Sequence, residues 1–428
     1  MGVKIFLLLF LNFGLVWCGK HDIYKGCSVY SVVLRNTDDL HTLYKLEVES
    51  NLDIWQHGLP GVREAVVMPT PENRDVFFEV MERNGIGFYE KIHDVAEALE
   101  KNEKDQLEKG MNRNNAVPFN KYPRYAEVDE YLDRLARQYP DIVTLVNAGP
   151  SFEGRAVKYL KISTSNFTDP KKPIYFMDAT IHAREWVTTP VALYSIHRLV
   201  EDLRTDERDL LEDIDWIILP IVNPDGYEYS HTNERLWRRT RSYRPEINET
   251  CYGVDGNRNF DVNFNTLGIS SDPCSNVYPG PEPFSEPETQ YVRDILQDDR
   301  IQIYLNIHSH GNYILYGFGN ASLPQNVLSL HQVGASMGAS IDTKKLDKAR
   351  FYAVGNSNLV LYGSSGSAQD YGQLVVPFSY TLELPGYEYS FDVPDDYINQ
   401  INVETWAGIV DSARLIKLFY AERINSES

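Results

Sequence analysis

Ile174-Tyr175-Phe176-Met177 is an apolar run, and His182-Ala183-Arg184-Glu185 follows it closely. The run predicts a buried strand, and a His and a Glu at this spacing can turn toward one point where a strand ends. A second apolar run, 301–307, ends at His308, which could supply a third ligand. Two histidines and one carboxylate leave a tetrahedral zinc with one open position, as in hydrolytic metal sites. The HxxE spacing alone fits an ordinary polar surface turn equally well, so the rest of the chain decides.

From about residue 120 onward, strand-like apolar runs alternate with amphipathic helical patterns. This alternation predicts an α/β fold, in which helices cover both faces of a mixed, mostly parallel sheet. In such sheets ligands bind beyond the strand ends, and both His182 and His308 follow a predicted strand. The strands are expected at 157–162, 174–177, 216–222, 301–307 and 375–384, and the helices at 126–138, 190–203, 286–296 and 325–339.

The region from about 24 to 94 follows a different order. Strand patterns at 28–34, 54–55, 64–68 and 87–90 are interrupted by two helical patterns, which begin at Thr37 and Pro71. The order β-α-β-β-α-β predicts a small α+β open sandwich with both helices on one side of its sheet. Residues 95–113 are highly charged and helix-prone, which is typical of a connecting helix that ends in a protease-sensitive stretch. An ordinary interdomain linker is the alternative.

Composition limits the class of protein. The chain has 428 residues, of which 43% are hydrophobic, enough for a large soluble domain and a small one. Its net charge of -20 disfavours nucleic acid as a partner, because phosphate binding needs clustered Lys and Arg. Residues 1–18 have one early positive charge and then a short apolar stretch, as in a secretory signal peptide. A membrane anchor is the alternative, and no other apolar run is long enough to cross a bilayer.

The cysteines fit an oxidising compartment. Cys251 and Cys274 bracket a segment rich in Gly, Asn and Pro, and we expect them to form a disulfide. Cys27 is then free or paired to another chain, although a Cys18–Cys27 bridge becomes possible if signal cleavage falls before Cys18. The sequons at Asn166, Asn248 and Asn320 suit a secreted protein.

Taken together, six motifs resemble the zinc metallocarboxypeptidases of the A/B type in their secreted zymogen form. The resemblance covers almost the whole chain after the signal peptide, and the motifs occur in the family's order. They are His182-Ala183-Arg184-Glu185-Trp186, Asn223-Pro224-Asp225-Gly226-Tyr227, Arg235-Leu236-Trp237-Arg238, Gly256-Asn257-Arg258-Asn259-Phe260, Ile307-His308-Ser309 and Thr381-Leu382-Glu383-Leu384.

The resemblance implies a division of the chain. Residues 1–18 would be the signal peptide, 19–113 an activation prodomain with its connecting helix, and 114–428 the catalytic domain. The prodomain would cover the active-site cleft until a trypsin-like protease cuts after Arg113, with Lys109 and Lys104 as alternative sites.

The resemblance also assigns the metal and the catalytic groups. His182, Glu185 and His308 would bind one Zn²⁺, whereas sequence alone would also allow His310, on the same strand face as His308. Glu383 would be the general base that takes a proton from the attacking water and passes one to the leaving amine. On sequence alone, a salt-bridged structural Glu is the alternative. Arg238 would stabilise the oxyanion.

Substrate recognition follows from the same resemblance. Arg258 would hold the substrate's C-terminal carboxylate through two parallel hydrogen bonds, which would make the enzyme an exopeptidase. Asn257 and Tyr362 would add contacts to that carboxylate, and Arg184 would bind substrate farther out. Gln369 matches the base of the side-chain pocket and carries no charge to pair with a buried ammonium. With Ser357 nearby, it favours a broad A-like preference for neutral C-terminal residues, while polar, basic or acidic residues remain alternatives.

The partners implied are peptides with a free C-terminus, an activating trypsin-like protease and proteinaceous carboxypeptidase inhibitors. A secreted monomer is expected, acting in a digestive lumen, without nucleic acid or membrane as a partner. A catalytically silent binding module is disfavoured because every expected zinc ligand and Glu383 are present. A zinc amidohydrolase on the same scaffold would not need Asn257, Arg258 or Tyr362.

Overall fold

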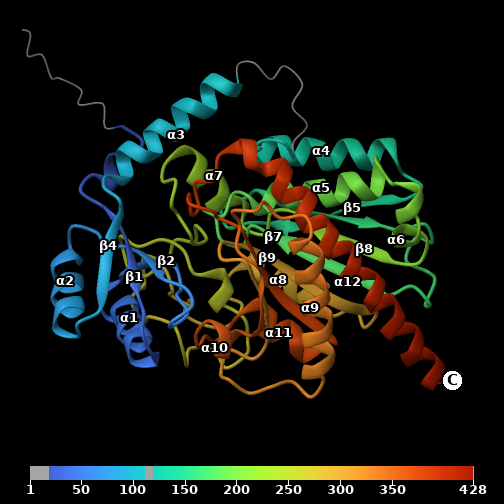
Figure 1. The fold of residues 1–428 in the computed structure, drawn as a ribbon. Coiled ribbons are helices and arrows are strands. Elements are labelled where there is room, and N and C mark those ends of the chain that lie inside the picture. Colours follow the sequence, from blue (N-terminus) through green and yellow to red (C-terminus); the bar gives the residue numbers. More distant parts are fainter. Residues whose placement is uncertain (1–18, 111–118, 428) are drawn as a thin grey trace, which may run out of the picture.

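The computed structural model of the chain describes residues 19–110 and 119–427, which form two packed domains (Figure 1). We call residues 19–110 the N-terminal domain and 119–427 the C-terminal domain. The expected signal peptide at 1–18 and the expected cleavage residue Arg113 lie outside the described residues.

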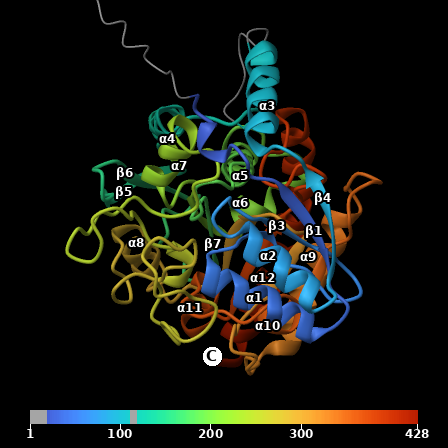
Figure 2. The same cartoon turned by 90° about the vertical axis from the view of Figure 1, so that its left-hand side faces the viewer.

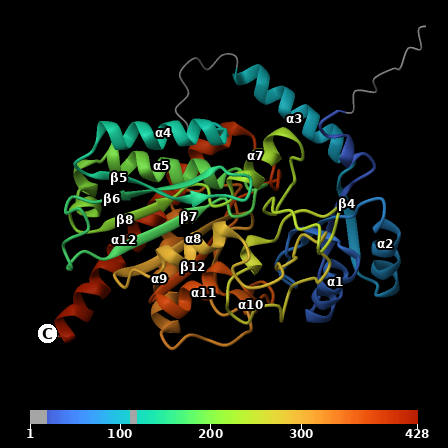
Figure 3. The same ribbon diagram turned by 180° about the vertical axis from the view of Figure 1, so that it is seen from behind.

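The C-terminal domain is built on an eight-stranded sheet with the order β11-β10-β12-β9-β7-β8-β6-β5. Its centre, β12-β9-β7-β8, is parallel, whereas β5 and β6 add antiparallel strands on one side and β10 pairs antiparallel with β12 on the other. Figure 3 shows β5, β6, β8 and β7 side by side. The strands are β5 (Val143–Pro150), β6 (Ala156–Ile162), β7 (Ile174–Ala179), β8 (Asp215–Leu219), β9 (Ile301–Ser309), β10 (Tyr313–Tyr316), β11 (Ala353–Asn356) and β12 (Phe378–Leu384).

Helices cover both faces of this sheet, as the sequence predicts. Tyr175 and Met177 of β7 pack in one core with residues of α4, α5, α9 and α12, whereas Phe176 packs in a second core with residues of α8 and α11. Because every residue of β7 is buried, its side chains form a continuous apolar run instead of an alternating one. The helices are α4 (Tyr125–Gln138), α5 (Thr188–Val200), α6 (Asp209–Glu212), α7 (Pro224–Thr232), α8 (Pro287–Ile295), α9 (Val327–Asp342), α10 (Ser357–Val360), α11 (Ala368–Val375) and α12 (Ile398–Glu427).

The N-terminal domain is the predicted open sandwich. Its four-stranded sheet has the order β2-β3-β1-β4 and pairs antiparallel throughout. One face, with Val32 and Val67, packs in a core with Leu43 of α1 and Phe77 of α2. The elements are β1 (Val29–Val33), α1 (Thr37–Ser50), β2 (Asp53–Gln56), β3 (Ala65–Met68), α2 (Arg74–Arg83), β4 (Gly87–Ile92) and α3 (Val95–Gly110).

The second face of the small sheet is not open to solvent. Val29, Trp55 and Val66 pack in one cluster with Leu236 and Phe391 of the C-terminal domain. Figure 2 looks onto the N-terminal domain, which lies in front of the C-terminal domain in that view. Apolar packing therefore joins the small sheet to loop residues of the C-terminal domain.

The predicted disulfide and the absence of a further membrane segment can both be checked in the fold. Cys251 and Cys274 form a disulfide, and Cys27 is buried and forms none within the described part of the chain. Across residues 19–110 and 119–427, no helix is both long and apolar enough to span a bilayer.

Candidate metal centre

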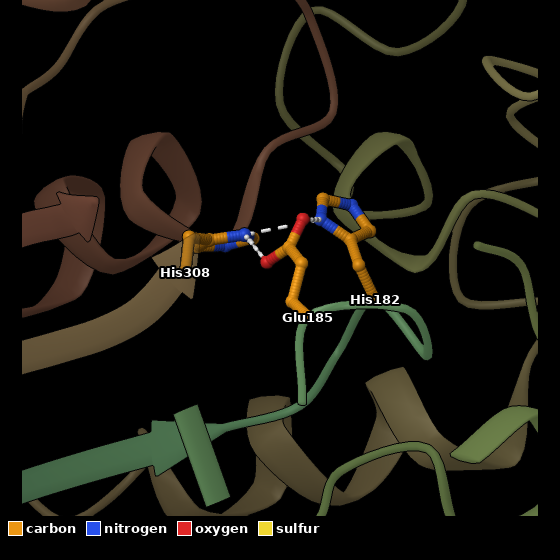
Figure 4. A group of neighbouring side chains, drawn as sticks. All are labelled: His182, Glu185 and His308. Atoms are coloured by element: carbon orange, nitrogen blue, oxygen red, sulfur yellow. Dashed lines mark hydrogen bonds and ion pairs between the residues drawn. The ribbon is translucent and has the colours of Figure 1, made fainter. Parts of the chain in front are cut away.

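The three predicted metal ligands meet at the ends of β7 and β9 (Figure 4). His182 Nδ1 lies 2.7 Å from Glu185 Oε1, and His308 Nδ1 lies 3.1 Å from Glu185 Oε2. The two Nδ1 atoms are 3.0 Å apart, and all three side chains are buried. Two imidazole nitrogens and a carboxylate directed at one point form a donor set that suits zinc. His310 is not part of this group.

The turn that carries His182 and Glu185 is fixed by hydrogen bonds from several elements. Ala183 N donates to Arg238 O at 2.9 Å, and Asn223 Nδ2 donates to Ile181 O at 3.2 Å. Thr180, at a φ of 61°, reverses the chain directly after β7 and places its hydroxyl 2.7 Å from that of Thr189. The ligands of this turn are therefore held in place before any metal binds.

Behind the ligands lies a layer of residues that the sequence analysis missed. Asp255 Oδ1 lies 3.0 Å from His182 Nε2, and Asp255 Oδ2 accepts from Arg238 Nη2 at 2.8 Å. Burial alone would raise the pKa of Asp255, but Arg238 and His182 hold it well below its usual range. A carboxylate on the second nitrogen orients a ligand His and increases its basicity. The feature of the sequence that could have identified Asp255 is its position directly before the motif Gly256-Asn257-Arg258.

His308 has a comparable support on its other side. Its Nε2 contacts Asn306 Oδ1, and Asn306 Nδ2 donates to Asp178 Oδ1 at 2.5 Å. Asp178 also accepts from the Tyr304 hydroxyl at 2.7 Å, while burial raises the pKa of Asp178 to about 6. Asn306 precedes His308 by two residues on β9, and alternate residues of a strand share a face. This spacing could have predicted from the sequence that Asn306 lies beside His308.

Glu383 lies beside the ligands on the neighbouring strand β12, where it pairs in register with His308. Its Oε2 atom is buried and has no hydrogen-bond partner among the described residues. Burial raises the pKa of Glu383 to about 7, although the nearby His308 lowers it. The sequence also allowed a structural Glu held in a salt bridge, but Glu383 forms no ion pair in the described part of the chain, and its Oε2 has no hydrogen-bond partner there. An unpaired carboxyl with a pKa near neutrality can accept and return a proton.

Arg238 reaches the same point from a different loop. Its Nη1 lies 3.2 Å from His182 Nδ1 and 3.7 Å from Glu185 Oε1, while Nε and Nη2 both donate to Asp255. Because Asp255 holds two of its nitrogens, the remaining Nη1 has a fixed direction toward the metal ligands. Arg238 is therefore preorganised to face negative charge beside the metal centre.

Arg258, Asn257 and Tyr362 come together next to this centre. Arg258 Nη2 donates to the Tyr362 hydroxyl at 2.7 Å, while its Nε and Nη1 donate to the backbone oxygens of Gly268 and Asn257. Asn257 Oδ1 accepts from Ala368 N at 2.8 Å. The guanidinium is thus rigidly held, with Tyr362 as its side-chain hydrogen-bond partner.

Arg184 is occupied by the N-terminal domain. Its Nη1 donates to both carboxylate oxygens of Asp53, at 2.9 and 2.8 Å, and only 2% of its surface is exposed. Asp53 also accepts from Trp55 Nε1 and Asn276 Nδ2. The pair crosses the domain interface, so the predicted outer substrate-binding Arg is bound by another part of the same chain.

The cavity at the metal centre is lined by both domains. The N-terminal domain contributes Ile54, Trp55, Gln56 and His57 from β2 and the residue after it. The C-terminal domain contributes the predicted residues His182, Arg184, Glu185, Arg238, Asn257, Arg258, His308, Tyr362 and Glu383. Ser357 and Gln369 do not line it. They are buried at the starts of α10 and α11, and Gln369 Nε2 lies 3.5 Å from Asp370 Oδ1.

A His-Glu-His group with an unpaired carboxyl and a fixed guanidinium beside it defines a metal-dependent hydrolase. The comparisons with known sequences narrow this class. The family described as zinc carboxypeptidase matches residues 128–408, and the carboxypeptidase activation peptide matches residues 30–102. The chain belongs to the zinc carboxypeptidase family, and its N-terminal domain is an activation peptide, so the whole is a zymogen with zinc as its cofactor.

Three relatives illustrate the similarity. Carboxypeptidase B of Helicoverpa zea is 44% identical over 424 residues, which cover 95% of this chain and 97% of that protein. The crystal structure of the carboxypeptidase A from Helicoverpa armigera is 41% identical, with a TM-score of 0.89 over 92% of this chain and 98% of that one. Bovine thrombin-activatable fibrinolysis inhibitor, solved in complex with tick carboxypeptidase inhibitor, is 28% identical with a TM-score of 0.64, over 70% of this chain and 99% of that one. Similar proteins thus carry both A and B names, and their names do not decide the C-terminal residue that this chain prefers.

Proposed function

We propose that the mature enzyme removes neutral C-terminal residues from peptides, and that the residues near the zinc ligands have separate roles in this reaction. Zinc, when bound, supplies Lewis acidity toward water and the scissile carbonyl. Glu383 takes the proton of the attacking water on its carboxylate and later gives a proton to the leaving amine. Its unpaired Oε2 and its pKa of about 7 support this role.

Two arginines bind the two negatively charged groups of the reacting substrate, which are the oxyanion and the C-terminal carboxylate. Arg238 Nη1 faces the ligand cluster and stabilises the oxygen that becomes negative when the carbonyl is attacked. Arg258 binds the C-terminal carboxylate of the substrate in a bidentate manner, after its Nη2 has released the Tyr362 hydroxyl. Asn257 and Tyr362 complete that carboxylate site, which restricts the enzyme to the last peptide bond.

The neutral preference rests on Gln369. Its amide is buried and carries no full charge, and its nearest side-chain partner is Asp370, whose carboxyl also accepts from Gly319 N at 2.7 Å. A buried ammonium or carboxylate on the substrate would need a charged partner at the end of the pocket to offset its lost hydration. Gln369 offers none, and Ser357 adds only a hydroxyl, so neutral side chains are favoured.

Activation follows from the contacts of the N-terminal domain. Asp53 neutralises Arg184, and β2 lies in the cavity that holds the metal ligands. We propose that a trypsin-like protease cuts after Arg113 and releases residues 19–113 from the catalytic domain 114–428. The sequence features of a signal peptide support secretion, with a digestive lumen as the proposed site of action. The complex of a relative with tick carboxypeptidase inhibitor supports protein inhibitors as further partners.

Hydrolysis of blocked dipeptides that differ only in their last residue tests this function. The secreted zymogen is cleaved with trypsin and assayed with and without a chelator, and uncleaved zymogen is the control. We expect chelator-sensitive release of Phe, Leu, Met and other neutral residues, and much slower release of Lys, Arg or Glu. Gln369→Asp is the matched variant, and it should shift the preference toward Lys and Arg. Preferential release of a charged residue by the wild type would contradict the neutral pocket but leave the exopeptidase reaction in place.

A further inference from the structure

A second cavity lies between the two domains, beside the cavity at the metal centre. It has a volume of about 340 Å³, and Gln56 and His310 line both cavities. Three loops of the C-terminal domain form one wall, and they carry His310 after β9, Lys348 and Arg350 before β11, and Glu388 after β12. The metal ligands and the catalytic and carboxylate-binding residues of the proposed reaction do not line this cavity. It is therefore a separate space, which we call the interface cavity.

The opposite wall of the interface cavity is one face of the small sheet. Ser31 of β1 pairs in register with Val66 of β3 and with Tyr89 of β4, so these three side chains share a face. Lys91 follows Tyr89 by two residues on β4 and lines the cavity with them. Glu64 also lines it and accepts from the Tyr89 hydroxyl at 2.6 Å. The N-terminal domain thus contributes one cation to this wall, and the acid beside it is bonded to a phenol.

Two cations of the interface cavity, one from each domain, have no carboxylate at ion-pair distance. Lys348 Nζ pairs with Glu388 Oε1 at 2.9 Å, so these two charges offset each other. Neither Lys91 nor Arg350 forms an ion pair within residues 19–110 and 119–427. Burial lowers the pKa of Lys91, Arg350 lowers it further, and the opposing effects of Glu64 and Glu388 are each smaller. Two positive charges therefore lie near each other across the domain interface.

His310 adds a buried polar atom at the end of the interface cavity that adjoins the metal centre. The residue is only 7% exposed, and its Nε2 has no hydrogen-bond partner among the described residues. Most buried polar groups in folded proteins are hydrogen-bonded, because an unpaired one is costly. A neutral imidazole that carries its hydrogen on Nε2 can donate it to an oxygen of a ligand. An unpartnered donor and two unpaired cations in one cavity indicate a ligand with negative charge and several acceptor atoms.

We propose that the interface cavity binds a small divalent oxyanion, inorganic phosphate or a phosphate monoester, between Lys91 of the N-terminal domain and Arg350 of the C-terminal domain. A guanidinium holds phosphate oxygens with its planar fork, and an ammonium holds them as a point charge. The cavity volume is at the low end of the range for small-molecule sites, which suits a ligand of this size. Because the anion contacts both domains, it binds the joined zymogen more tightly than the separated parts. By mass action it therefore stabilises their association.

Titration of the uncleaved, zinc-loaded zymogen with inorganic phosphate, followed by phosphorus NMR, tests this site. Sodium chloride of equal ionic strength is the control for screening. We expect saturable binding with a Kd on the order of 1 mM, as two charge-assisted hydrogen bonds would give. Lys91→Gln and Arg350→Gln should each weaken binding by about tenfold or more. Lys45→Gln and Arg137→Gln are the matched controls, since each removes one exposed cation from one domain and should leave the Kd unchanged.

The association of the two domains gives a second, independent measurement. The zymogen is cleaved with trypsin, and size-exclusion chromatography then measures how much of the cut N-terminal domain stays bound to the catalytic domain. At about 10 mM phosphate and a Kd of about 1 mM, the apparent dissociation constant of the cut complex should fall about tenfold. Arg350→Gln should remove this effect of phosphate, whereas Arg137→Gln should retain it.

The outcomes distinguish the interface cavity from the metal centre. Phosphate binding that neither Lys91→Gln nor Arg350→Gln weakens overturns the proposal, because neither residue lines the metal-centre cavity and such binding would belong to zinc or Arg258. The absence of saturable binding to wild type overturns it as well, even if one variant fails to fold. Loss of binding in Arg350→Gln alone overturns the bridging role of the anion. Glycerol phosphate separates the two sources, since tighter binding than phosphate assigns the site to a monoester and weaker binding assigns it to the inorganic ion.

Discussion

The two domains of this zymogen satisfy their buried charges in opposite ways. In the C-terminal domain, Asp255 is paired with His182 and Arg238 of the same domain, so the pairing persists when the N-terminal domain leaves. In the N-terminal domain, the buried carboxylate of Asp53 is paired with Arg184 across the interface. The first arrangement prepares chemistry, whereas the second exists only in the uncleaved chain. Charges paired within the C-terminal domain thus remain with the site, and we propose that the charge pair between the domains keeps the zymogen inactive.

A second contact between the domains has a different physical basis. His57 stacks on Tyr362 with ring centroids 3.9 Å apart, and the Tyr44 ring lies 5.1 Å from that of Tyr362. Burial and the nearby Arg258 hold the pKa of His57 well below its usual value, so the imidazole is neutral. The stack keeps Tyr362 on Arg258, where the carboxylate of a substrate would bind. The interface beside the metal centre therefore includes an ion pair and an aromatic stack, and the two can be removed separately.

The largest expected effect comes from the C-terminal domain alone. Glu383→Gln removes the proposed general base but keeps the size of the side chain. In the trypsin-activated enzyme we expect kcat/KM to fall by about 10²- to 10⁴-fold, while the zinc content of the protein stays unchanged. Steady-state kinetics and metal analysis measure the two quantities. Glu288→Gln, another buried carboxylate of this domain, is the control and should retain activity. Activity of Glu383→Gln within tenfold of wild type would show that Glu383 is not the base.

Breaking the interface ion pair should have the next largest effect. Asp53→Asn leaves Arg184 buried without a charged partner, and losing one side of such a pair costs about 2–5 kcal/mol. The activity of uncleaved zymogen toward a small blocked dipeptide should therefore rise at least about 30-fold. Glu82→Gln changes an exposed acid on α2 and should not alter this activity. If Asp53→Asn zymogen stays as silent as wild type, the ion pair does not hold the domain in place.

Stability should depend on pH through a carboxyl group that neither the metal centre nor the interface uses. Burial, with Glu286 nearby, raises the pKa of Glu288 to about 8 in the folded protein. The unfolded chain releases this proton near its ordinary pKa, so the unfolding free energy falls as pH rises from about 4.5 to about 8 and is flat above. Glu288→Gln removes this pH-dependent loss of stability, which amounts to at most about 5 kcal/mol. Calorimetric Tm values should therefore diverge in favour of the variant between pH 5 and pH 9. Parallel Tm curves would mean that Glu288 is not protonated in the folded protein.

The smallest expected effect concerns the aromatic contact between the domains. His57→Ala removes a stack worth about 0.5–1.5 kcal/mol and should raise the activity of uncleaved zymogen by about two- to tenfold. His57→Phe retains an aromatic face and should stay close to wild type. Equal activation by both variants would indicate that the imidazole nitrogens, and not the ring face, hold Tyr362. Comparing the zymogen activity of His57→Ala with that of Asp53→Asn would show whether the ring contact or the ion pair contributes more to inhibition of the uncleaved chain.

Local pattern was sufficient for most of the architecture but not for strands that lack an apolar run. β7 and β9 could be predicted because every residue in them is buried. β5 was missed because its exposed and partly buried residues give no regular alternation, and β10 and β11 because each has only four residues. The run from Val375 was predicted as strand, yet α11 extends to Val375 and β12 begins at Phe378. The Ser367 side chain caps α11 by accepting from Asp370 N, and that signal outweighs the apolar run that follows.

The sequence by itself placed His182 and Glu185 in one turn and His308 at the end of a strand that its own hydrophobicity defines, and it left His310 as an alternative to His308. Only the tertiary structure decided what those residues touch. Asp255 reaches His182 from a separate loop, and Asp53 reaches Arg184 from the other domain. Hydrophobic periodicity reports the burial of a residue along its own element, whereas the partner of a buried charge depends on how distant elements pack. The grouping of His182, Glu185 and His308 could therefore be anticipated from local sequence and the family resemblance, while their contacts with Asp255 and those of Arg184 with Asp53 arise from tertiary packing.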